Sequence, residues 1–136
     1  MGSFAGMLQA NGATVRGSDQ GAFPPMSDRL TDWGIPFADS YAPNNLDWGP
    51  DLVIVGNVIR AVNPEAEEMR NRELPHMSFP EALGTFFLAN RHPIVVTGTH
   101  GKTTTTSLTS WLLESAAKEP GFLIGGTPAN FGKSFQ

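Results

Sequence analysis

The sequence has no cysteine, which excludes disulfides, thiolate nucleophiles and thiolate metal sites. No apolar run reaches the roughly 18 residues that a membrane span requires, and the start lacks the basic segment and long apolar run of a secretory signal. Basic residues are also few: 9 Lys and Arg face 13 Asp and Glu, for a net charge of -4. Because no diffuse basic surface is available for a polyanion, we expect no nucleic-acid binding and expect any anion to be held at a local site. The absence of cysteine, of a membrane span and of a secretory signal leads us to expect a cytoplasmic protein that does not bind a membrane.

The apolar residues that are present predict an α/β fold. A hydrophobic fraction of 40% over 136 residues is enough for a globular core. Helical spacing and capping residues favour helices over residues 2–10, 28–33, 64–73, 80–88 and 102–118. Short apolar runs predict strands over residues 14–16, 35–37, 52–55, 93–98 and 122–126, and the β-branched run 52–55 is expected to be a buried, central parallel strand. The "ANRHP" segment is typical of a linker, so we expect two units, residues 1–90 and 91–136.

The segment "VVTGTHGKTTTTS", residues 95–107, joins a predicted strand to a predicted helix. Backbone amides in a tight glycine turn can point at an anion, and the positive end of the following helix and a lysine ammonium reinforce them. Lys102 is then expected to reach the terminal phosphates of a nucleotide, Thr103 to bind Mg²⁺, and Thr104 to donate to a phosphate oxygen. The common G-x-x-x-x-G-K-[ST] loop would place glycine where Val96 stands, so an ordinary capped turn is the alternative.

A family resemblance supports the phosphate-loop interpretation. "TGTHGKTTTTS" resembles the ATP-binding loop of the Mur ligases, ATP-dependent amide-forming enzymes of bacterial peptidoglycan synthesis. The resemblance implies that ATP and Mg²⁺ are the cofactors, that Lys102 and Thr103 act in catalysis, and that the ATP phosphates are held by Gly98, Thr99, His100, Gly101, Lys102, Thr103 and Thr104. Because relatives carry asparagine at the position of His100, an obligatory acid-base role for this histidine is not expected.

Further segments resemble one branch of this family. They are "GNVIRAVNPEAE", "SFPEALGTFFL" and "FLIGGTPANFGKS". In that branch UDP-N-acetylmuramate is joined to the recycled tripeptide L-alanyl-γ-D-glutamyl-meso-diaminopimelate through an acyl-phosphate. The resemblance therefore implies a UDP-sugar and a peptide amine as partners; the branch that adds L-alanine is the alternative. The sequence carries no indication of an oligomeric state.

The family fold implies a Rossmann-like UDP-binding domain followed by a P-loop-type ATP-binding domain. "MGSFAGML" resembles the end of the glycine-rich turn and the helix after the first Rossmann strand, with Gly2 and Ser3 at the UDP-substrate. We therefore expect that the first strand is missing, that the chain stops early in the ATP-binding domain, and that the fragment alone is inactive.

Other candidates for the UDP-substrate site lie after predicted strands or in loops. Ser18 and Asp19 stand where Rossmann-like units place an acidic residue near a ribose or base, although "GSDQG" is also ordinary turn sequence. Asn57 and Arg60 follow the run 52–55, and Arg60 either meets a phosphate or is simply solvated. By resemblance Asn130 touches the UDP-substrate; a loop hydrogen bond is the alternative. The three histidines have no metal-ligand spacing.

Two functional classes outside the family compete with the ligase hypothesis. A P-loop kinase or GTPase would share Lys102 and Thr103, but its phosphate loop normally follows the first strand of the chain, whereas here a separate α/β unit precedes it. A non-catalytic dinucleotide-binding module would bind the UDP-sugar and never ATP. Binding of a non-hydrolysable ATP analogue with Mg²⁺, with and without UDP-N-acetylmuramate, separates these classes.

Overall fold

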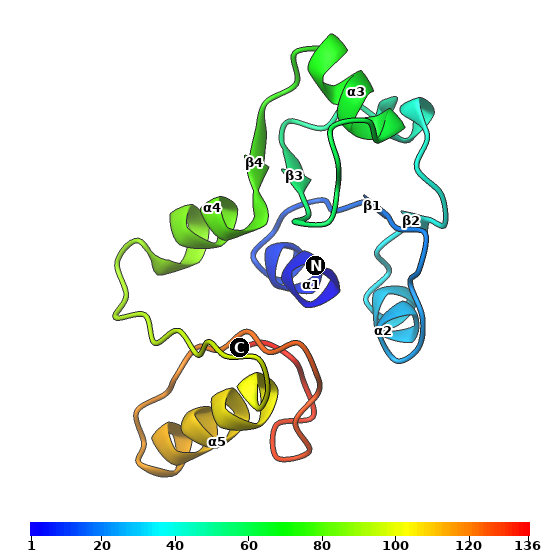
Figure 1. The fold of residues 1–136 in the computed structure, drawn as a ribbon. Coiled ribbons are helices and arrows are strands. Elements are labelled where there is room, and N and C mark those ends of the chain that lie inside the picture. Colours follow the sequence, from blue (N-terminus) through cyan, green and yellow to red (C-terminus); the bar gives the residue numbers. More distant parts are fainter.

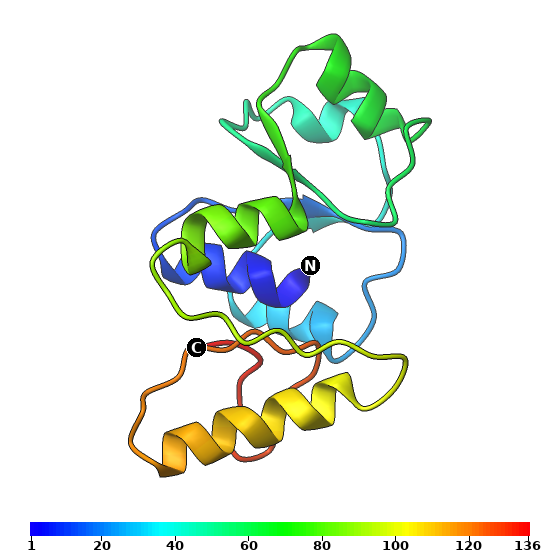
Figure 2. The same ribbon diagram turned by 60° about the vertical axis from the view of Figure 1, so that its left-hand side comes forward.

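The computed structural model describes residues 1–136 and has an elongated arrangement of three parts (Figures 1 and 2). Both views place α3 with β3 and β4 at one end, α1, α2 and α4 in the middle, and α5 with the last residues of the chain at the other end. The helices are α1 (Gly2–Ala10), α2 (Met26–Asp32), α3 (Pro64–Asn71), α4 (Phe79–Leu83) and α5 (Lys102–Ser115), with a 3-10 turn η1 (Pro43–Leu46) and a π-helical turn η2 (Gly84–Leu88). The strands are β1 (Gly17–Ser18), β2 (Phe37–Ala38), β3 (Val53–Val55) and β4 (His76–Ser78).

The strands form two separate parallel pairs, which confirms an α/β fold. β1 pairs with β2, and β3 pairs with β4 in the register Val53 to His76. The prediction of a fully buried central strand over 52–55 is wrong, because β3 has one hydrogen-bonded neighbour and its three residues are only half-buried. Every helix is too short or too polar to cross a bilayer.

Helix starts follow the capping residues in the sequence. The Asn63 side chain accepts hydrogen bonds from the Glu65 and Ala66 amides, with Pro64 at the first helical position, as the sequence predicts. α4 begins one residue before the predicted start at Pro80, because Ser78 and Glu81 form a capping box. The predicted continuation to residue 88 is a π-helical turn, not an α-helix.

Helix ends are set by residues in left-handed backbone conformations. α1 ends at Ala10 as predicted, and Gly12 follows with φ 93°. α3 ends two residues before the predicted end, and Glu73 has φ 53°. α5 begins at Lys102 as predicted but ends at Ser115, and Ala117 and Glu119 have positive φ. A left-handed residue cannot continue a right-handed helix, so these ends are sharp.

The strand predictions fail where no second strand is available to pair. Residues 93–98 form no strand, and the Ile94 and Val95 side chains are 60% and 74% exposed. Residues 122–126 make only one antiparallel bridge, between Leu123 and Phe135. The predicted strands over 14–16 and 35–37 are displaced to β1 and β2, since Gly17 N–H bonds to Pro36 O and Asp19 N–H bonds to Ala38 O. β-branched sequence alone does not supply a hydrogen-bonding partner.

The main core surrounds the first helix. Phe4 on α1 is 2% exposed, and its ring makes edge-to-face contacts with Phe79 and Phe87, at centroid distances of 5.1 and 5.7 Å. The other buried apolar residues are Leu30, Ile35, Leu46, Ala66, Met69, Ala82, Phe122 and Ile124. Aromatic edge contacts add to the hydrophobic gain of burial, so α1 is held firmly against the start and end of the 79–88 segment.

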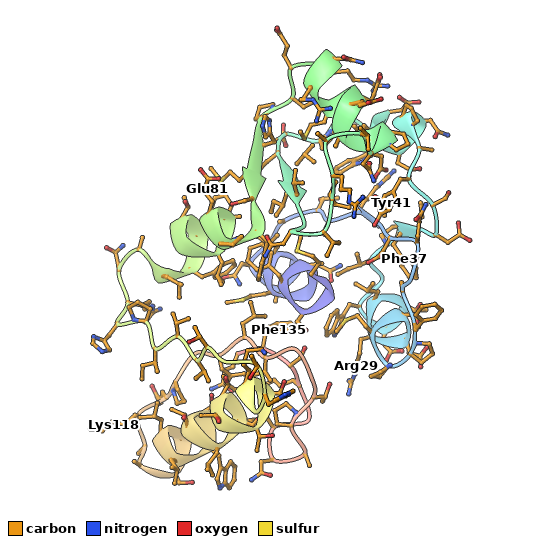
Figure 3. The ribbon with its side chains drawn as sticks, viewed as in Figure 1. Arg29, Phe37, Tyr41, Glu81, Lys118 and Phe135 are labelled. Atoms are coloured by element: carbon orange, nitrogen blue, oxygen red, sulfur yellow. The ribbon has the colours of Figure 1, made fainter.

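The C-terminal segment ties the α5 end of the molecule to the middle. Phe135 packs edge-to-face on Trp33 at 5.4 Å, and Arg29 donates to the Gly132 carbonyl at 3.4 Å. Figure 3 shows Phe135 between α5 and α1, and Arg29 on the side of α2 that faces the same region. This contact fixes the position of the 122–136 segment against α1 and α2.

Gly6 is the tightest point of this contact. A Cβ at Gly6 would lie 2.6 Å from the Trp33 ring and 2.8 Å from the Phe135 ring. We expect Gly6→Ala to lower the free energy of unfolding by about 1–3 kcal/mol, because both rings must move. Gly84→Ala is the matched control: no atom lies within 4 Å of its Cβ and its backbone is helical, so a gain of roughly 0.5–1 kcal/mol is expected. Equal effects of the two substitutions in denaturant unfolding would contradict this packing.

Candidate functional site

The predicted phosphate loop is an irregular turn that leads directly into α5. Gly98 has φ 149° and Gly101 has φ 75°, conformations that favour glycine at both positions. Gly101 is the N-cap residue of α5, and no side chain caps this helix end. The first helical amide with a partner is that of Thr105, which bonds to the Gly101 carbonyl at 2.9 Å. The N–H groups of Lys102, Thr103 and Thr104 therefore stay open at the positive end of the helix dipole.

The Lys102 side chain folds back over this loop. Its ammonium donates to the Gly98 carbonyl at 2.6 Å and to the Thr99 carbonyl at 3.2 Å. The ammonium thus lies on the same side of the loop as residues 98 and 99, and the lysine is exposed. The ammonium can exchange its hydrogen bonds to the two neutral carbonyls for a hydrogen bond to an anionic phosphate oxygen. The new bond would be the stronger one, because both of its partners are charged.

Only the first part of the threonine run has free hydroxyls. The Thr106 hydroxyl donates to the Lys102 carbonyl at 2.8 Å, and the Ser107 hydroxyl donates to the Thr103 carbonyl at 2.7 Å. These bonds to the preceding turn occupy the hydroxyls within the helix. The Thr103 and Thr104 hydroxyls make no hydrogen bond in the structure, so they are available at the start of α5.

A cavity of about 370 Å³ joins the start of α5 to the C-terminal loop. It is lined by Thr103, Thr104, Ser107, Leu108, Trp111, Pro128, Ala129 and Asn130. Phe131 packs edge-to-face on Trp111 at a centroid distance of 5.7 Å and in a tilted arrangement on Phe122 at 4.4 Å, and these contacts anchor the loop that carries Asn130. The structure therefore brings Thr103 and Thr104 together with Asn130, although the sequence separates them by more than twenty residues.

Acidic residues are missing from the phosphate loop. No group of three or more His, Cys, Asp or Glu side chains is placed to hold a metal ion. The chain offers instead the exposed Thr103 hydroxyl, a hard oxygen ligand of the kind that Mg²⁺ prefers. Because Mg²⁺ commonly retains waters and takes its other ligands from nucleotide phosphates, one hydroxyl at this position fits the ion.

A second set of candidate residues meets where α1 begins and β3 ends. A Cβ at Gly56 would lie 3.6 Å from the Met1 side chain, and a Cβ at Gly2 would lie 2.3 Å from the Met26 sulfur. Gly2 is thus close to α2, and the residue before it is close to the end of β3. Ser3 is 6% exposed and faces the interior. Of the two candidates Gly2 and Ser3, Gly2 is the better placed for contact with a ligand, because it is only half-buried.

Asn57 and Arg60 line one cavity of about 360 Å³ beside β3. Val55, Gly56, Arg70 and His76 also contribute to its wall. The Arg70 guanidinium donates to the Ala61 carbonyl at 2.5 Å, which fixes the loop after β3 against α3. The cavities beside β3 and α5 share no lining residue, so Asn130 does not join Asn57 and Arg60 in this structure.

Ser18 and Asp19 lie at the carboxyl end of β1. The Ser18 hydroxyl donates to the Glu65 carboxylate in the first turn of α3, and Asp19 accepts from the Gly21 amide at 3.0 Å.

Tyr41 lies just beyond β2, above Phe37 in Figure 3. Burial is the largest cause that raises the pKa of the Tyr41 phenol, and the negative charges of Asp19 and Glu65 raise it further against a hydrogen bond from the Gln20 backbone. The phenol therefore keeps its proton through neutral pH.

Sequence reasoning did not single out Glu65 or Tyr41 for this site. Glu65 has a sufficient local explanation, since an acidic residue in the first turn of a helix complements the dipole. Its bond to Ser18 spans 47 residues, and no periodicity or motif connects positions so far apart. Finding this bond from the sequence would have required knowing that the end of β1 lies beside the first turn of α3.

Comparisons with known proteins show the family to which the chain belongs. A family model described as "Mur ligase family, catalytic domain" matches residues 1–91. The UDP-N-acetylmuramate–L-alanyl-γ-D-glutamyl-meso-2,6-diaminoheptandioate ligase of Escherichia coli K12 is 43% identical over 96% of this chain and 29% of its own length. The chain thus spans less than a third of the length of this curated relative.

Solved structures of two related ligases superpose on the chain. The UDP-N-acetylmuramate:L-alanyl-γ-D-glutamyl-meso-diaminopimelate ligase from Neisseria meningitides has a TM-score of 0.93 and 40% identity, and the match covers 99% of this chain and 42% of that one. The UDP-N-acetylmuramate-alanine ligase from Thermotoga maritima has a TM-score of 0.88 and 28% identity, covering 100% of this chain and 32% of that one.

Proposed function

The chain belongs to the Mur ligase family, and from this membership we propose that the whole protein is an ATP-dependent ligase that joins UDP-N-acetylmuramate to the tripeptide L-alanyl-γ-D-glutamyl-meso-diaminopimelate. The observation that carries the proposal is the 98–104 loop, with two glycines in conformations that favour glycine, open amides at the start of α5 and Lys102 held over it. We assign ATP to this loop, residues 91–136 to the beginning of a P-loop-type domain, and residues 1–90 to a Rossmann-like UDP-substrate domain.

The loop residues have separate tasks in this proposal. The open amides of Lys102, Thr103 and Thr104 bind phosphate oxygens, and the glycines at 98 and 101 let the backbone approach them. The Lys102 ammonium leaves the two loop carbonyls for the terminal phosphates, where it offsets the repulsion between an attacking carboxylate and the triphosphate. Gly98, Thr99 and His100 shape the turn, and His100 needs no role in proton transfer because the attacking carboxylate carries no proton to remove.

Thr103 is the residue of this chain that would hold Mg²⁺. When bound, the ion supplies further neutralisation of the phosphate charge. Thr104 donates its hydroxyl to a phosphate oxygen, and Asn130, which lines the same cavity, orients the UDP-substrate beside the triphosphate. Positioning and charge neutralisation, without a covalent enzyme intermediate, are the contribution of these residues.

The UDP-substrate occupies the first unit in this proposal. Gly2 and Ser3 lie at the start of α1, Ser18 and Asp19 at the end of β1, and Asn57 and Arg60 after β3. These three pairs of residues lie at the carboxyl ends of parallel strands or at the start of α1, and open α/β sheets bind ligands at such strand ends. A cytoplasmic location follows from the proposal because ATP and the nucleotide-linked sugar are cytoplasmic compounds.

The proposal is tested by product analysis of the whole protein with ATP, Mg²⁺ and UDP-N-acetylmuramate. We expect the tripeptide to give UDP-N-acetylmuramyl-tripeptide with one phosphate released for each amide bond formed. L-alanine in place of the tripeptide serves as the control, and a preference for L-alanine would transfer the assignment to the alternative branch. ATP hydrolysis without an amide product, or UDP-sugar binding without ATP binding, would refute the ligase assignment.

A further inference from the structure

Asn130 lies in a turn that its own backbone closes. The amides of Phe131 and Gly132 both donate to the Pro128 carbonyl, at 3.1 and 2.9 Å. Two hydrogen bonds to one carbonyl hold residues 128–132 together, so the position of Asn130 depends on the contacts that hold the whole turn.

One anchor of this turn comes from α5. Phe131 packs on Trp111 of α5 at a centroid distance of 5.7 Å and on Phe122 at 4.4 Å. Phe122 is 6% exposed, and its amide and carbonyl both bond to the backbone of Gln136. This anchor ties the turn to the helix that begins at the phosphate loop.

The other anchor comes from α2, in residues 1–90. Arg29 of α2 donates to the carbonyl of Gly132, the last residue of the turn, at 3.4 Å. Trp33, at the end of α2, packs edge-to-face on Phe135 at 5.4 Å, and a Cβ at Gly6 would lie 2.6 Å from one ring and 2.8 Å from the other. Figures 1 and 2 both show the last residues of the chain between α5 and the middle of the molecule. The turn is thus held from both sides.

On the basis of the proposed function, we propose that Trp33 is a positioning residue that places Asn130 for contact with the UDP-substrate. Trp33 lines neither the cavity beside β3 nor the cavity beside α5, so it acts through Phe135 and not on a ligand. Without this contact the turn keeps its anchor on α5 alone, and binding must then order Asn130 at a cost in affinity.

Steady-state kinetics of the whole protein with Trp33→Leu tests the inference. The KM for UDP-N-acetylmuramate should rise about fivefold to tenfold, the scale of one weakened hydrogen bond. The KM for ATP should stay within about twofold, because the 98–104 loop and α5 are not altered. Trp33→Phe keeps an aromatic edge for Phe135 and should restore the first KM to within about twofold. An equal rise in both KM values, or no rescue by phenylalanine, would overturn the inference.

A double substitution with Asn130→Ala shows whether Trp33 acts through Asn130. In the Asn130→Ala background, Trp33→Leu should change the KM for UDP-N-acetylmuramate by less than about twofold, because the side chain that it positions is gone. Multiplication of the two single effects would contradict the inference. An unchanged KM in Asn130→Ala alone would overturn both the inference and the placement of Asn130 at the UDP-substrate, but not the ligase assignment.

Trp48→Leu is the matched control. Trp48 also lies in residues 1–90, but it is 37% exposed and its ring faces the Arg16 guanidinium at 5.2 Å. Both KM values of this variant should equal those of the unmodified protein. A rise equal to that of Trp33→Leu would mean that the loss of any tryptophan from this part of the chain has the same effect, and would overturn the inference.

Phe135→Leu keeps the inference testable if Trp33→Leu does not fold. It removes the same ring contact from the other side and should give the same rise in the KM for UDP-N-acetylmuramate. Product formation with an unchanged KM in either variant refutes only the role of Trp33. Absence of product from the unmodified protein with ATP, UDP-N-acetylmuramate and the tripeptide refutes the proposed function as well.

Discussion

Lys102→Ala is expected to lower the ATP turnover of the whole protein by roughly a thousandfold or more, in line with the loss of a full charge from a phosphoryl-transfer site. Lys102 is the single Lys or Arg in residues 98–104, and its ammonium contacts the carbonyls of Gly98 and Thr99. Phosphate release in the presence of UDP-N-acetylmuramate and the tripeptide is the measurement. Thermal unfolding should be nearly unchanged, because the side chain is exposed and stabilises no core.

Lys118→Ala is the control for this substitution. Lys118 follows the far end of α5, where Figure 3 shows it well away from the phosphate loop, and it is also exposed. It removes the same charge from the neighbourhood of the same helix, so its turnover should match that of the unmodified protein. Lys102→Ala with normal turnover, or an equal loss in both variants, would contradict the role of the loop.

Phe4→Ala is expected to lower the free energy of unfolding by about 3–5 kcal/mol, the range found when a buried phenylalanine is truncated. Phe4 is 2% exposed, and its ring makes edge contacts with the rings of Phe79 and Phe87. The substitution removes both edge contacts and leaves a cavity between α1 and the 79–88 segment. Denaturant unfolding of the whole protein, followed by far-UV circular dichroism, measures the effect.

Phe23→Ala is the same chemical change at an exposed position. The Phe23 side chain is 73% exposed, so its loss should alter stability by only about 0.5 kcal/mol or less. A loss of stability in Phe4→Ala that does not exceed that of Phe23→Ala would show that the aromatic cluster around α1 is not the core of this unit.

The helices were predictable from the sequence because their signals are local. Asn63 and Pro64 mark the start of α3, and the glycine before Lys102 marks the start of α5. The strands were harder because a strand depends on its neighbour. The apolar run 93–98 has stronger β-forming sequence than "HMS" of β4, yet only β4 lies beside a partner, with His76 opposite Val53.

The candidate site shows the same division between local and distant information. The geometry of the 98–104 loop follows from glycines and a helix start that are adjacent in sequence. The shared cavity of Thr103, Thr104 and Asn130 and the bond from Ser18 to Glu65 arise only when distant segments pack together. Family resemblance pointed to Asn130, whereas physical reasoning from the sequence had no means to find Glu65.

The most direct test of the account is a crystal structure of the whole protein with a non-hydrolysable ATP analogue and Mg²⁺. We predict that the terminal phosphates lie at the start of α5, with oxygens at roughly 2.7–3.2 Å from the amides of Lys102, Thr103 and Thr104. The Lys102 ammonium should have moved from the Gly98 and Thr99 carbonyls to a phosphate oxygen. A triphosphate bound elsewhere, with Lys102 still on those two carbonyls, would contradict the account.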